Sequence, residues 1–376
     1  MRVLFAGVPG HGHVLPMLAL VDAFRAVGDQ VTIATGPDLC RYLQDRGYRT
    51  VAAGASGEQL RDFVRLNRPP HLPPNQGMAF AWGELFTRFH APLMLADLLA
   101  VIDGWKPDLL IHESAEFATP LAGTLRGLPW VNHGYGVMRP VEIQRVATEA
   151  MRALWQDEGL SMPIAAGMFD HAYVDVCPPS LQLDQRLPPT RMPMRPTHVR
   201  AQRSPSHERG HLHVLVTFGT VFHRDAALVG EVVRTVARLP VTVLVTSGPG
   251  VAPEALGPQP QNVRVIEYAP LADLLPQCAA VVCHGGSGTI LAALAHGKPL
   301  VVLPQGADQF LNAQQVLASG SGLTSAGTAA VEEALAHLLD EPTYRSRAEQ
   351  IAVEIAAMPM ATEVAEQLRT LATTRR

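Results

Sequence analysis

The chain has 376 residues and a mass of 40.5 kDa, a length typical of two or three ordinary domains. Hydrophobic residues make up 47% of the sequence and charged residues 17%, so the composition is that of a globular protein and excludes a disordered one. The net charge of −4 and the pI near 6.4 give no electrostatic reason to expect nucleic acid as the main partner.

The cysteine pattern and the start of the chain bear on where the protein works. The four cysteines are scattered and form no C-x-x-C pair, which argues against a disulfide framework and against a cysteine zinc site. The apolar N-terminal run is broken at once by prolines, glycines and histidines, unlike a signal peptide. No stretch approaches the ~18 to 20 apolar residues needed to cross a bilayer. We therefore expect a cytoplasmic protein without a membrane partner.

In the first half of the chain, short apolar runs alternate with longer helical patterns. The predicted strands are residues 2–8, 30–35, 109–112 and 130–132. The predicted helices are residues 15–27, 39–46, 93–105 and 115–126. This alternation is typical of a parallel sheet that is covered by helices on both faces. Residues 54–90 interrupt it with aromatic side chains among prolines and glycines, and are either a lid or pocket wall or a helical excursion that only covers the sheet.

The second half repeats this design after a proline-rich stretch. Between residues 178 and 205 the prolines are too dense for a helix or a central strand, and residues 201–210 are predicted to be a linker. The predicted strands are then residues 212–217, 242–246, 263–267, 280–283 and 300–303. The predicted helices are residues 226–238, 290–295, 310–318, 329–340 and 360–371. The chain is therefore predicted to be α/β, with two Rossmann-like, doubly wound domains.

The turn after the first predicted strand contains two glycines and two histidines, Gly10-His11-Gly12-His13, and opens a helix. In an open parallel sheet, ligands bind at this carboxyl edge. The glycine order differs from that of a dinucleotide-binding turn, which leaves a dehydrogenase as a weaker alternative. A metal site on His11 and His13 is another alternative. The interpretation we favour is a histidine general base, because the helix dipole keeps such a histidine neutral.

A general base needs a partner on its other ring nitrogen. Glu113 directly follows a predicted strand, so it should lie at the same edge of the sheet. Glu116 is its rival but falls further along, on the following helix. Glu113 has the alternative role of a helix-start carboxylate that accepts hydrogen bonds from unpaired N–H groups.

A second glycine-rich turn, His284-Gly285-Gly286-Ser287-Gly288-Thr289, lies between a predicted strand and a predicted helix. Its small residues expose backbone N–H groups, and the helix dipole favours an anion, so the pattern predicts a phosphate site. It is not a P-loop, because G-x-x-x-x-G-K-[ST] occurs nowhere in the sequence. His284 can donate one more hydrogen bond to a phosphate oxygen. Asp308 and Gln309 follow the next strand and can bind two sugar hydroxyls.

Together these residues resemble the GT-B glycosyltransferases, an inverting family that uses nucleotide diphosphosugars, and most of all its bacterial enzymes that glycosylate antibiotic aglycones. The segments that carry the resemblance are residues 10–16, 177–182, 283–289 and 303–309. The resemblance implies two Rossmann-like domains that face each other across a cleft. The N-terminal acceptor domain would be residues 1–200, followed by a linker, residues 201–210. The C-terminal donor domain would be residues 211–358, and a final helix, residues 359–376, would cross back to the first domain.

The resemblance also implies roles for individual residues. His13 would be the general base, held by Glu113 where the family usually has an aspartate. The implied donor-binding residues are Gly219, Thr220, Tyr268, Ala269, His284, Gly286, Ser287, Gly288, Thr289, Asp308 and Gln309. Many relatives have tryptophan in place of Tyr268, which leaves the choice between TDP and UDP open. The residues expected to bind the acceptor are Gly12, Phe63, Met78, Phe80, Trp82, Phe86 and Met138.

The implied function is transfer of a sugar or deoxysugar, with inversion, from a TDP- or UDP-sugar to a hydrophobic natural-product acceptor of the polyketide or antibiotic type. No cofactor or metal is expected, and the D-x-D motif of the other main glycosyltransferase fold is absent from the sequence. A nucleotide-sugar epimerase of the same fold and a non-catalytic auxiliary subunit that binds a nucleotide sugar are the alternatives. The oligomeric state is open, with a homodimer as one candidate.

Overall fold

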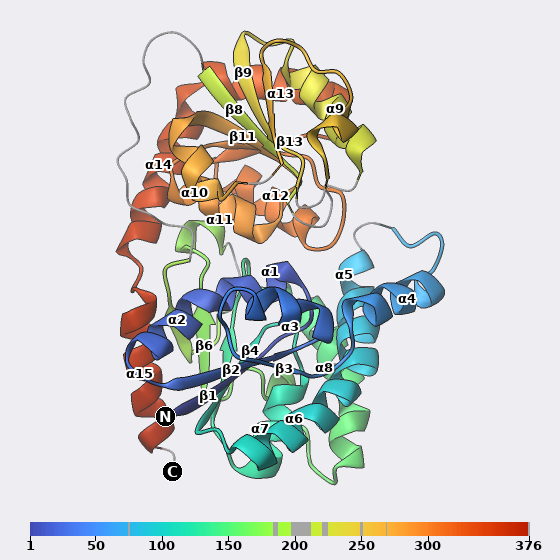
Figure 1. The fold of residues 1–376 in the computed structure, drawn as a ribbon, viewed down its shortest axis with the longest axis vertical. Helices are drawn as coiled ribbons and strands as arrows, with labels where there is room; N and C mark the ends of the chain where they lie inside the picture. The colour runs from blue at the N-terminus through green and yellow to red at the C-terminus, as the bar shows by residue number, and fades with distance from the viewer. Residues whose placement is uncertain are drawn as a thin grey trace. The chain divides into compact units, whose positions relative to one another are not determined.

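The computed structural model describes residues 1–73, 76–182, 187–196, 212–219, 225–248, 251–267 and 269–374 (Figure 1). The chain forms two compact units, each with its own parallel sheet. The first unit contains Met1–Cys177, Asp184–Thr197 and Pro359–Arg376, and the second contains Pro178–Leu183 and His198–Met358. The predicted fold class, two doubly wound α/β domains, is confirmed. The predicted linker, residues 201–210, lies outside the described residues.

The sheet of the first unit has seven parallel strands in the order β3-β2-β1-β4-β5-β6-β7. The strands are β1 (Arg2–Ala6), β2 (Gln30–Thr35), β3 (Thr50–Ala52), β4 (Leu109–Glu113), β5 (Trp130–His133), β6 (Ala172–Asp175) and β7 (Arg191–Pro193). The strand order reverses between β1 and β4, and the turns that follow these two strands lie at the topological switch point. This is the position at which open parallel sheets bind ligands.

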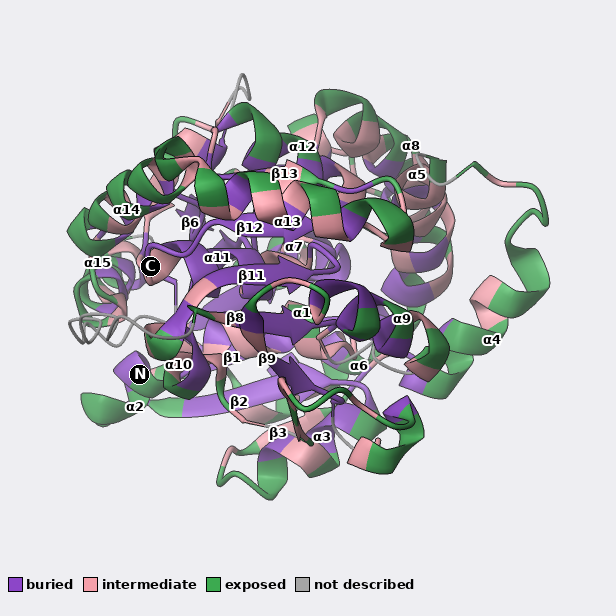
Figure 2. Ribbon diagram, turned by 90° about the horizontal axis from the view of Figure 1, so that it is seen from above, coloured by how far each residue is buried: buried purple, intermediate pink, exposed green. Residues whose placement is uncertain are grey.

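Helices cover both faces of this sheet, and their outer surfaces are exposed while the strands are buried (Figure 2). The helices are α1 (His11–Val14), α2 (Leu18–Ala26), α3 (Pro37–Gln44), α4 (Gly57–Asn67), α5 (Gly77–Phe80), α6 (Ala91–Trp105), α7 (Ala118–Arg126), α8 (Val141–Asp157) and α15 (Ala361–Thr374), with a π-helix, η3 (Ala81–His90), joining α5 to α6. The last helix, α15, packs against α2 (Figure 1). Arg369 on α15 forms an ion pair with the buried Asp29, which also binds the N-terminal ammonium group.

Several elements of the first unit were not predicted from the sequence: β3, β6, β7 and α8. Strand β7 lies in the proline-rich stretch, where no central strand was expected. It is an edge strand with Pro193 at its end, a position where a missing N–H group costs no ladder hydrogen bond. Residues 54–90, which interrupted the predicted pattern, are largely helical and form α4, α5 and η3.

The continuous helical run Gly77–Trp105 has 29 residues and is long and apolar enough to span a membrane by length and composition alone. This corrects the expectation that no stretch approaches that length. Half of its most apolar window is buried inside the unit, and Met94, Leu95 and Leu98 belong to the core between the helices and the sheet. Packing within the protein therefore accounts for the apolar character of this run.

The sheet of the second unit has six parallel strands in the order β10-β9-β8-β11-β12-β13. The strands are β8 (Leu212–Thr217), β9 (Val241–Thr246), β10 (Val263–Ile266), β11 (Cys278–Cys283), β12 (Leu300–Val302) and β13 (Gly322–Thr324). The helices are α9 (Ala226–Val236), α10 (Leu271–Leu274), α11 (Ser287–Ala295), α12 (Gln309–Ala318), α13 (Val331–Asp340) and α14 (Pro342–Ala357). Here the switch point lies between β8 and β11, so the turns after these strands form the equivalent ligand position.

The short segment Pro178–Leu183 belongs to the second unit because Ser180 is bound to helix α14. Its backbone N–H and its hydroxyl group donate to the two carboxylate oxygens of Glu354, at 3.1 and 2.5 Å. Arg347 on the same helix donates to the Ser180 hydroxyl oxygen at 3.3 Å. A segment singled out by the sequence resemblance is thus fixed to α14.

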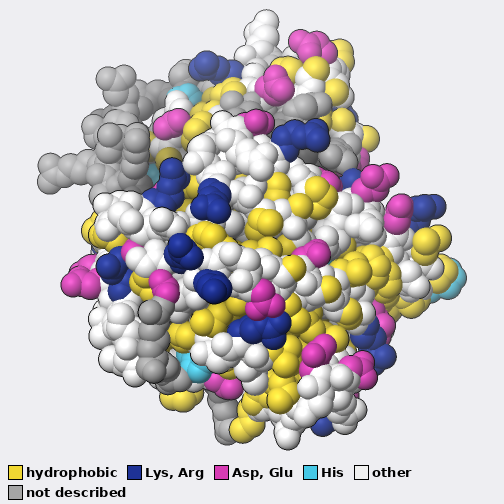
Figure 3. Space-filling view, turned by 60° about the horizontal axis from the view of Figure 1, so that its bottom comes forward, with side chains coloured by type: hydrophobic (Ala, Val, Ile, Leu, Met, Phe, Trp, Pro, Cys, Tyr) yellow, Lys and Arg dark blue, Asp and Glu magenta, His cyan; other side chains and the backbone are white. Residues whose placement is uncertain are grey.

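The surface agrees with the small net charge. On the face shown in Figure 3, Lys and Arg side chains are interspersed with Asp and Glu side chains and with apolar ones.

Candidate active site

The turn after β1 and the end of β4 bring His13 and Glu113 together. His13 Nδ1 lies 3.2 Å from Glu113 Oε2, with the histidine partly exposed and the carboxylate fully buried. An ionised carboxylate only accepts hydrogen bonds, so the contact favours the tautomer in which Nδ1, the nitrogen that faces Glu113, has the hydrogen. The tautomer set in this way makes Nε2, on the other side of the ring, the basic nitrogen.

Glu113 is held as a carboxylate by what surrounds it. The backbone N–H groups of Val8 and Ala115 donate to its two oxygens at 3.2 and 2.7 Å. Burial raises the pKa of Glu113, but the charge of His13 and the hydrogen bonds from His13, Ala115 and Val8 oppose it and leave the pKa below its ordinary value. The negative charge that orients His13 is therefore built into the fold.

The imidazole ring of His13 is also fixed by aromatic neighbours. Phe86, on the π-helix η3, meets it edge-on with the ring centroids 5.5 Å apart, and Tyr135, after β5, lies at 5.0 Å. A Cβ atom on Gly10 would lie 2.8 Å from His13 Cδ2, so the ring can occupy this position only because residue 10 is glycine. A Cβ atom on Gly7 would lie 3.3 Å from Glu113 Cγ.

His11 does not share this site. Its ring packs edge-on against Tyr42 at 4.6 Å, and burial together with the nearby Arg46 lowers its pKa. Within the described residues, no three His, Cys, Asp or Glu side chains are placed to hold a metal ion. The geometry gives no support to a metal pair made of His11 and His13.

Glu116, the rival carboxylate, performs a different task. Its two oxygens accept the backbone N–H groups of Ala118 and Thr119 at the start of α7, at 2.7 and 3.1 Å. His112 Nδ1 lies 3.9 Å from it and 2.8 Å from its backbone oxygen. Burial raises the pKa of Glu116 to about 7, against the opposing effect of these hydrogen bonds. Glu116 caps a helix, and Glu113 is the residue that contacts His13.

In the second unit, the turn after β11 presents His284 between two glycines. A Cβ atom on Gly219 would lie 2.7 Å from its Cε1, and one on Gly286 would lie 2.7 Å from its Nε2. Burial lowers the pKa of His284 to about 4, although Asp308 and a backbone hydrogen bond with Thr217 act in the opposite direction. His284 is therefore a neutral histidine near pH 7.

Helix α11 begins at Ser287, directly after this turn. The first N–H groups of a helix have no intrahelical acceptor, so those of Ser287 and Gly288 can meet an anion. The Ser287 hydroxyl donates to Asp308 Oδ2 at 3.0 Å, and Asn312 donates to both of these residues and to the Gly285 carbonyl. The hydroxyl of Ser287 thus fixes the turn instead of pointing outward as a free donor.

Asp308 and Gln309, predicted to contact the donor sugar, are both held by hydrogen bonds, Asp308 to the turn after β11 and Gln309 to the turn after β12. The Gln309 side-chain oxygen accepts the backbone N–H groups of Gln305 and Gly306 at 2.7 and 3.1 Å. Its amide nitrogen is the group left to donate to a ligand. Ala307, directly before Asp308, adopts the left-handed conformation with φ of 52°, a costly conformation that alanine adopts only where the surrounding structure holds it.

The structure places the remaining predicted donor residues as follows. Thr220 and Tyr268 lie outside the described residues. Gly219, with φ of 67°, ends the described stretch after β8 and packs on His284. Thr289 is buried in the first turn of α11, and Ala269 is half-buried just before α10.

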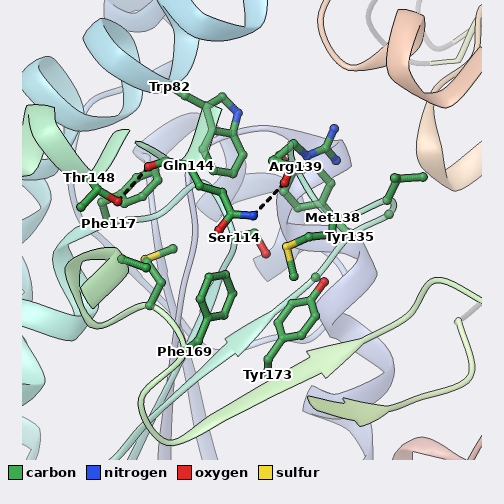
Figure 4. A pocket seen from close by; sticks show the side chains of 15 residues that line it. Trp82, Ser114, Phe117, Tyr135, Met138, Arg139, Gln144, Thr148, Phe169 and Tyr173 are labelled. Atoms are coloured by element: carbon green, nitrogen blue, oxygen red, sulfur yellow. Dashed lines mark hydrogen bonds between the residues drawn. The ribbon is translucent and has the colours of Figure 1, made fainter. Parts of the chain in front are cut away.

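A pocket of about 430 Å³, a volume that includes space open to solvent, lies in the first unit (Figure 4). Its lining residues come from η3, from the turns after β4 and β5, from α8, and from strand β6 and the segment before it. They are Trp82, Ser114, Phe117, Gly134, Tyr135, Gly136, Val137, Met138, Arg139, Gln144, Thr148, Ala165, Met168, Phe169 and Tyr173. Tyr135 both lines this pocket and touches the ring of His13, so the pocket adjoins the histidine.

Two of the predicted acceptor residues, Trp82 and Met138, line this pocket, and the other five do not. Phe63 stacks on Phe80 and Phe89, with ring centroids 6.4 and 4.5 Å apart, because α4 packs over the helical run that follows it. Met78 packs against the same core, Gly12 is exposed on α1, and Phe86 contacts His13 instead of the pocket.

Family models match both units of the chain. The model described as erythromycin biosynthesis protein CIII-like, N-terminal domain, matches residues 74–197, and its C-terminal counterpart matches residues 249–371. The chain belongs to this family. It is a glycosyltransferase with the GT-B fold, as the sequence resemblance predicted.

Curated relatives and solved structures agree. The chain is 32% identical to the L-demethylnoviosyl transferase of Streptomyces niveus and 31% identical to the elloramycin glycosyltransferase ElmGT of Streptomyces olivaceus. Each alignment covers 98% of this chain and 97% of the relative. The glycosyltransferase VinC, solved in complex with dTDP, has a similar fold, with a TM-score of 0.79, 24% identity and complete coverage of both chains.

Sequence reasoning missed Asn312, Tyr135 and most of the pocket lining. Asn312 lies one helical turn after Asp308, and this spacing of four residues was a usable signal. Tyr135 follows β5 at the same sheet edge as Glu113, so its position could also have been inferred. Phe169 and Tyr173 gave no such signal, because they belong to a segment around the unpredicted strand β6.

Proposed function

We infer that this enzyme transfers a sugar, with inversion, from a TDP- or UDP-sugar to an apolar natural-product acceptor, and that His13 is the general base. The observation that carries this proposal is the contact of His13 with the buried carboxylate of Glu113, beside a pocket lined by apolar side chains. A histidine oriented in this way by a carboxylate is the arrangement that activates hydroxyl nucleophiles.

The reaction follows from this geometry. His13 Nε2 takes the proton of the acceptor hydroxyl while the hydroxyl oxygen forms a bond to the anomeric carbon. The bond between that carbon and the donor diphosphate breaks, and its electron pair leaves with the nucleotide. Glu113 stays ionised and stabilises the imidazolium, which later releases its proton to water. Attack opposite the leaving group inverts the configuration.

The second unit would bind the diphosphate of the donor. The free N–H groups at the start of α11 can donate to its oxygens. The neutral ring of His284 has one N–H, which can donate to a phosphate oxygen in place of the Thr217 backbone. Hydrogen bonds from fixed donors stabilise the charge that develops on a leaving group, and we propose that they do so here without a divalent metal. VinC was solved with dTDP, which supports thymine as the base of the donor nucleotide.

Two features favour a transferase over the alternatives. A nucleotide-sugar epimerase needs no pocket for an apolar acceptor beside its base, and a non-catalytic subunit needs no base held by a carboxylate. Both features are present in the first unit. All four cysteines are buried free thiols, which supports a reducing cytoplasm as the place of action.

The test is transfer by the purified chain after EDTA treatment. The protein is incubated with TDP-glucose or UDP-glucose and a panel of phenol and alcohol acceptors, and products are detected by mass spectrometry. The anomeric proton coupling in the product then reports the configuration. We expect a β-linked product from the α-linked donor in the absence of metal. Retention of configuration would contradict the proposal, as would strict dependence on added Mg²⁺.

A further inference from the structure

The pocket beside His13 has an unusual lining. Of the fifteen residues that form it, five are aromatic: Trp82, Phe117, Tyr135, Phe169 and Tyr173. Two methionines add polarizable sulfur atoms, and none of the described residues that line the pocket is leucine or isoleucine. Three of these aromatic residues, Trp82, Phe117 and Tyr135, also belong to the hydrophobic core of the unit, which fixes their rings.

These rings are arranged in perpendicular pairs. Trp82 and Phe117 lie 5.5 Å apart at 81°, and Phe169 and Tyr173 lie 5.4 Å apart at 85°. In Figure 4 Trp82 lies on the side of the pocket opposite Phe169 and Tyr173. A perpendicular pair presents both a ring face and a ring edge, the two surfaces against which an aromatic ligand packs by offset stacking and edge-to-face contact.

Several polar groups in the lining are bound to the protein itself. The Ser114 hydroxyl donates to Asn132 Oδ1 at 2.7 Å, the Gln144 amide donates to the Arg139 carbonyl at 2.7 Å, and the Thr148 hydroxyl donates to the Gln144 carbonyl at 2.8 Å. The last two bonds are drawn in Figure 4. An acceptor covered with hydroxyl groups would have to compete with these bonds, whereas bare rings would not.

From these contacts we propose that the acceptor is a flat, fused-ring aromatic compound and that the hydroxyl group which receives the sugar is a phenol. The proposal rests on the proposed function and names the acceptor class of that same site. The rings enter between the aromatic pairs, and the hydroxyl is directed past Tyr135 to His13.

The chemistry of the base agrees with a phenol. The phenol of a tyrosine has a pKa of about 10 and a free imidazole one of about 6.5. A saturated alcohol holds its proton about as tightly as water, whose pKa is about 15.7. Proton transfer to imidazole is therefore far less uphill from a phenol, and the phenolate that forms attacks the anomeric carbon as its proton moves to His13.

The test compares 1-naphthol with trans-1-decalol, which share a carbon skeleton and a hydroxyl position and differ in flatness and π-electrons. Their binding to the whole enzyme is measured by calorimetry with TDP present. We expect 1-naphthol to bind at least about tenfold more tightly, since each aromatic contact contributes a fewfold to tenfold in affinity. Equal affinities, tighter binding of the decalol, or no binding of either compound up to its solubility limit would overturn the proposal.

Two matched variants locate the effect. Phe169→Leu removes a ring that lines the pocket, and Phe63→Leu removes a ring that stacks on Phe80 and Phe89 outside it. The preference for naphthol should fall severalfold in Phe169→Leu and stay unchanged in Phe63→Leu. An equal loss in both variants would assign the effect to general loosening of the unit and contradict the proposal.

Titration with TDP alone separates this proposal from the function on which it rests. If TDP binds and 1-naphthol does not, the acceptor class is wrong while the glycosyltransferase mechanism stands. If neither TDP nor UDP binds to the wild-type enzyme, the proposed donor site fails independently of the acceptor.

Discussion

The two glycine-rich turns occupy equivalent places in the two units and are built for different chemistry. Each turn follows a central strand at the switch point of its sheet and holds a histidine. In the first unit His13 contacts the buried carboxylate of Glu113 at 3.2 Å. In the second unit His284 is enclosed by glycine backbone, and burial lowers its pKa to about 4.

The difference teaches how one topology can supply a proton acceptor and an anion site. A carboxylate beside an imidazole stabilises the protonated ring, which a general base needs. A buried histidine whose charge is disfavoured stays neutral near pH 7. Its single N–H can donate to a phosphate when it exchanges its protein acceptor, here the Thr217 backbone, for the ligand. Variants of each turn can distinguish these two roles.

The largest effect is expected for His13→Ala. Loss of a general base lowers turnover by roughly 10²- to 10⁴-fold. Initial rates at saturating donor and acceptor measure this loss. The control is His11→Ala, because His11 packs on Tyr42 and not on Glu113. Wild-type turnover in His13→Ala would contradict the proposal that His13 is the general base.

Glu113→Gln should lower turnover by roughly 10²-fold, at the lower end of the range for acid–base catalysis. The amide keeps an oxygen to accept the N–H group of Val8 but cannot stabilise an imidazolium on His13. Glu113→Asp keeps the charge and should lose less. The turnover of both variants is measured at saturating donor. The two rates separate the contribution of the negative charge from that of the side-chain length. Wild-type turnover in Glu113→Gln, or a smaller loss there than in Glu113→Asp, would contradict the need for a negative charge beside His13.

Gly286→Ala should weaken TDP binding by roughly tenfold, the worth of one hydrogen bond to a charged group. The new Cβ atom would lie 2.7 Å from His284 Nε2 and force the ring to move. Gly327→Ala is the matched control, since a Cβ atom there meets nothing within 4 Å. Calorimetry measures both affinities, and wild-type affinity in Gly286→Ala would contradict the proposed role of His284.

A smaller effect is expected on acid stability. Burial lowers the pKa of His90, His112 and His133 in the first unit to about 4, as it does for His284 in the second. A histidine with a lowered pKa contributes stability that is present above its ordinary pKa of 6.5 and is lost as the pH falls from 6.5 to 4. Among the described residues, three histidines of the first unit and one of the second have a pKa lowered to about 4.

Glu113 and Glu116 modify this dependence. The lowered pKa of Glu113 gives stability that is present above 4.5 and lost below it, in the same direction as the histidines. The pKa of Glu116 is raised to about 7, so this residue stabilises the folded state as the pH falls from 7 to 4.5 and opposes the effect of the histidines.

We expect hydrogen exchange between pH 6.5 and 4.5 to show the first unit opening severalfold more than the second. Earlier opening of the second unit would contradict this ranking.

The sequence alone led to the fold class and to His13, Glu113 and His284, because glycine turns after predicted strands must meet at the carboxyl edge of a parallel sheet. It did not predict that Phe63 and Phe80 stack on each other outside the pocket, since an aromatic side chain in a helix gives the same pattern whether it lines a pocket or packs on another helix. The role of Ser287 in binding Asp308 was also hidden, because hydrogen bonds between separate turns depend on tertiary geometry.

The most direct test of the division between the two turns is calorimetric titration of TDP into EDTA-treated wild-type enzyme, His13→Ala and His284→Ala. The account predicts that TDP binds without metal, that His284→Ala weakens binding by roughly tenfold, and that His13→Ala leaves it unchanged. Equal weakening in both variants, or undiminished binding in His284→Ala, would contradict it.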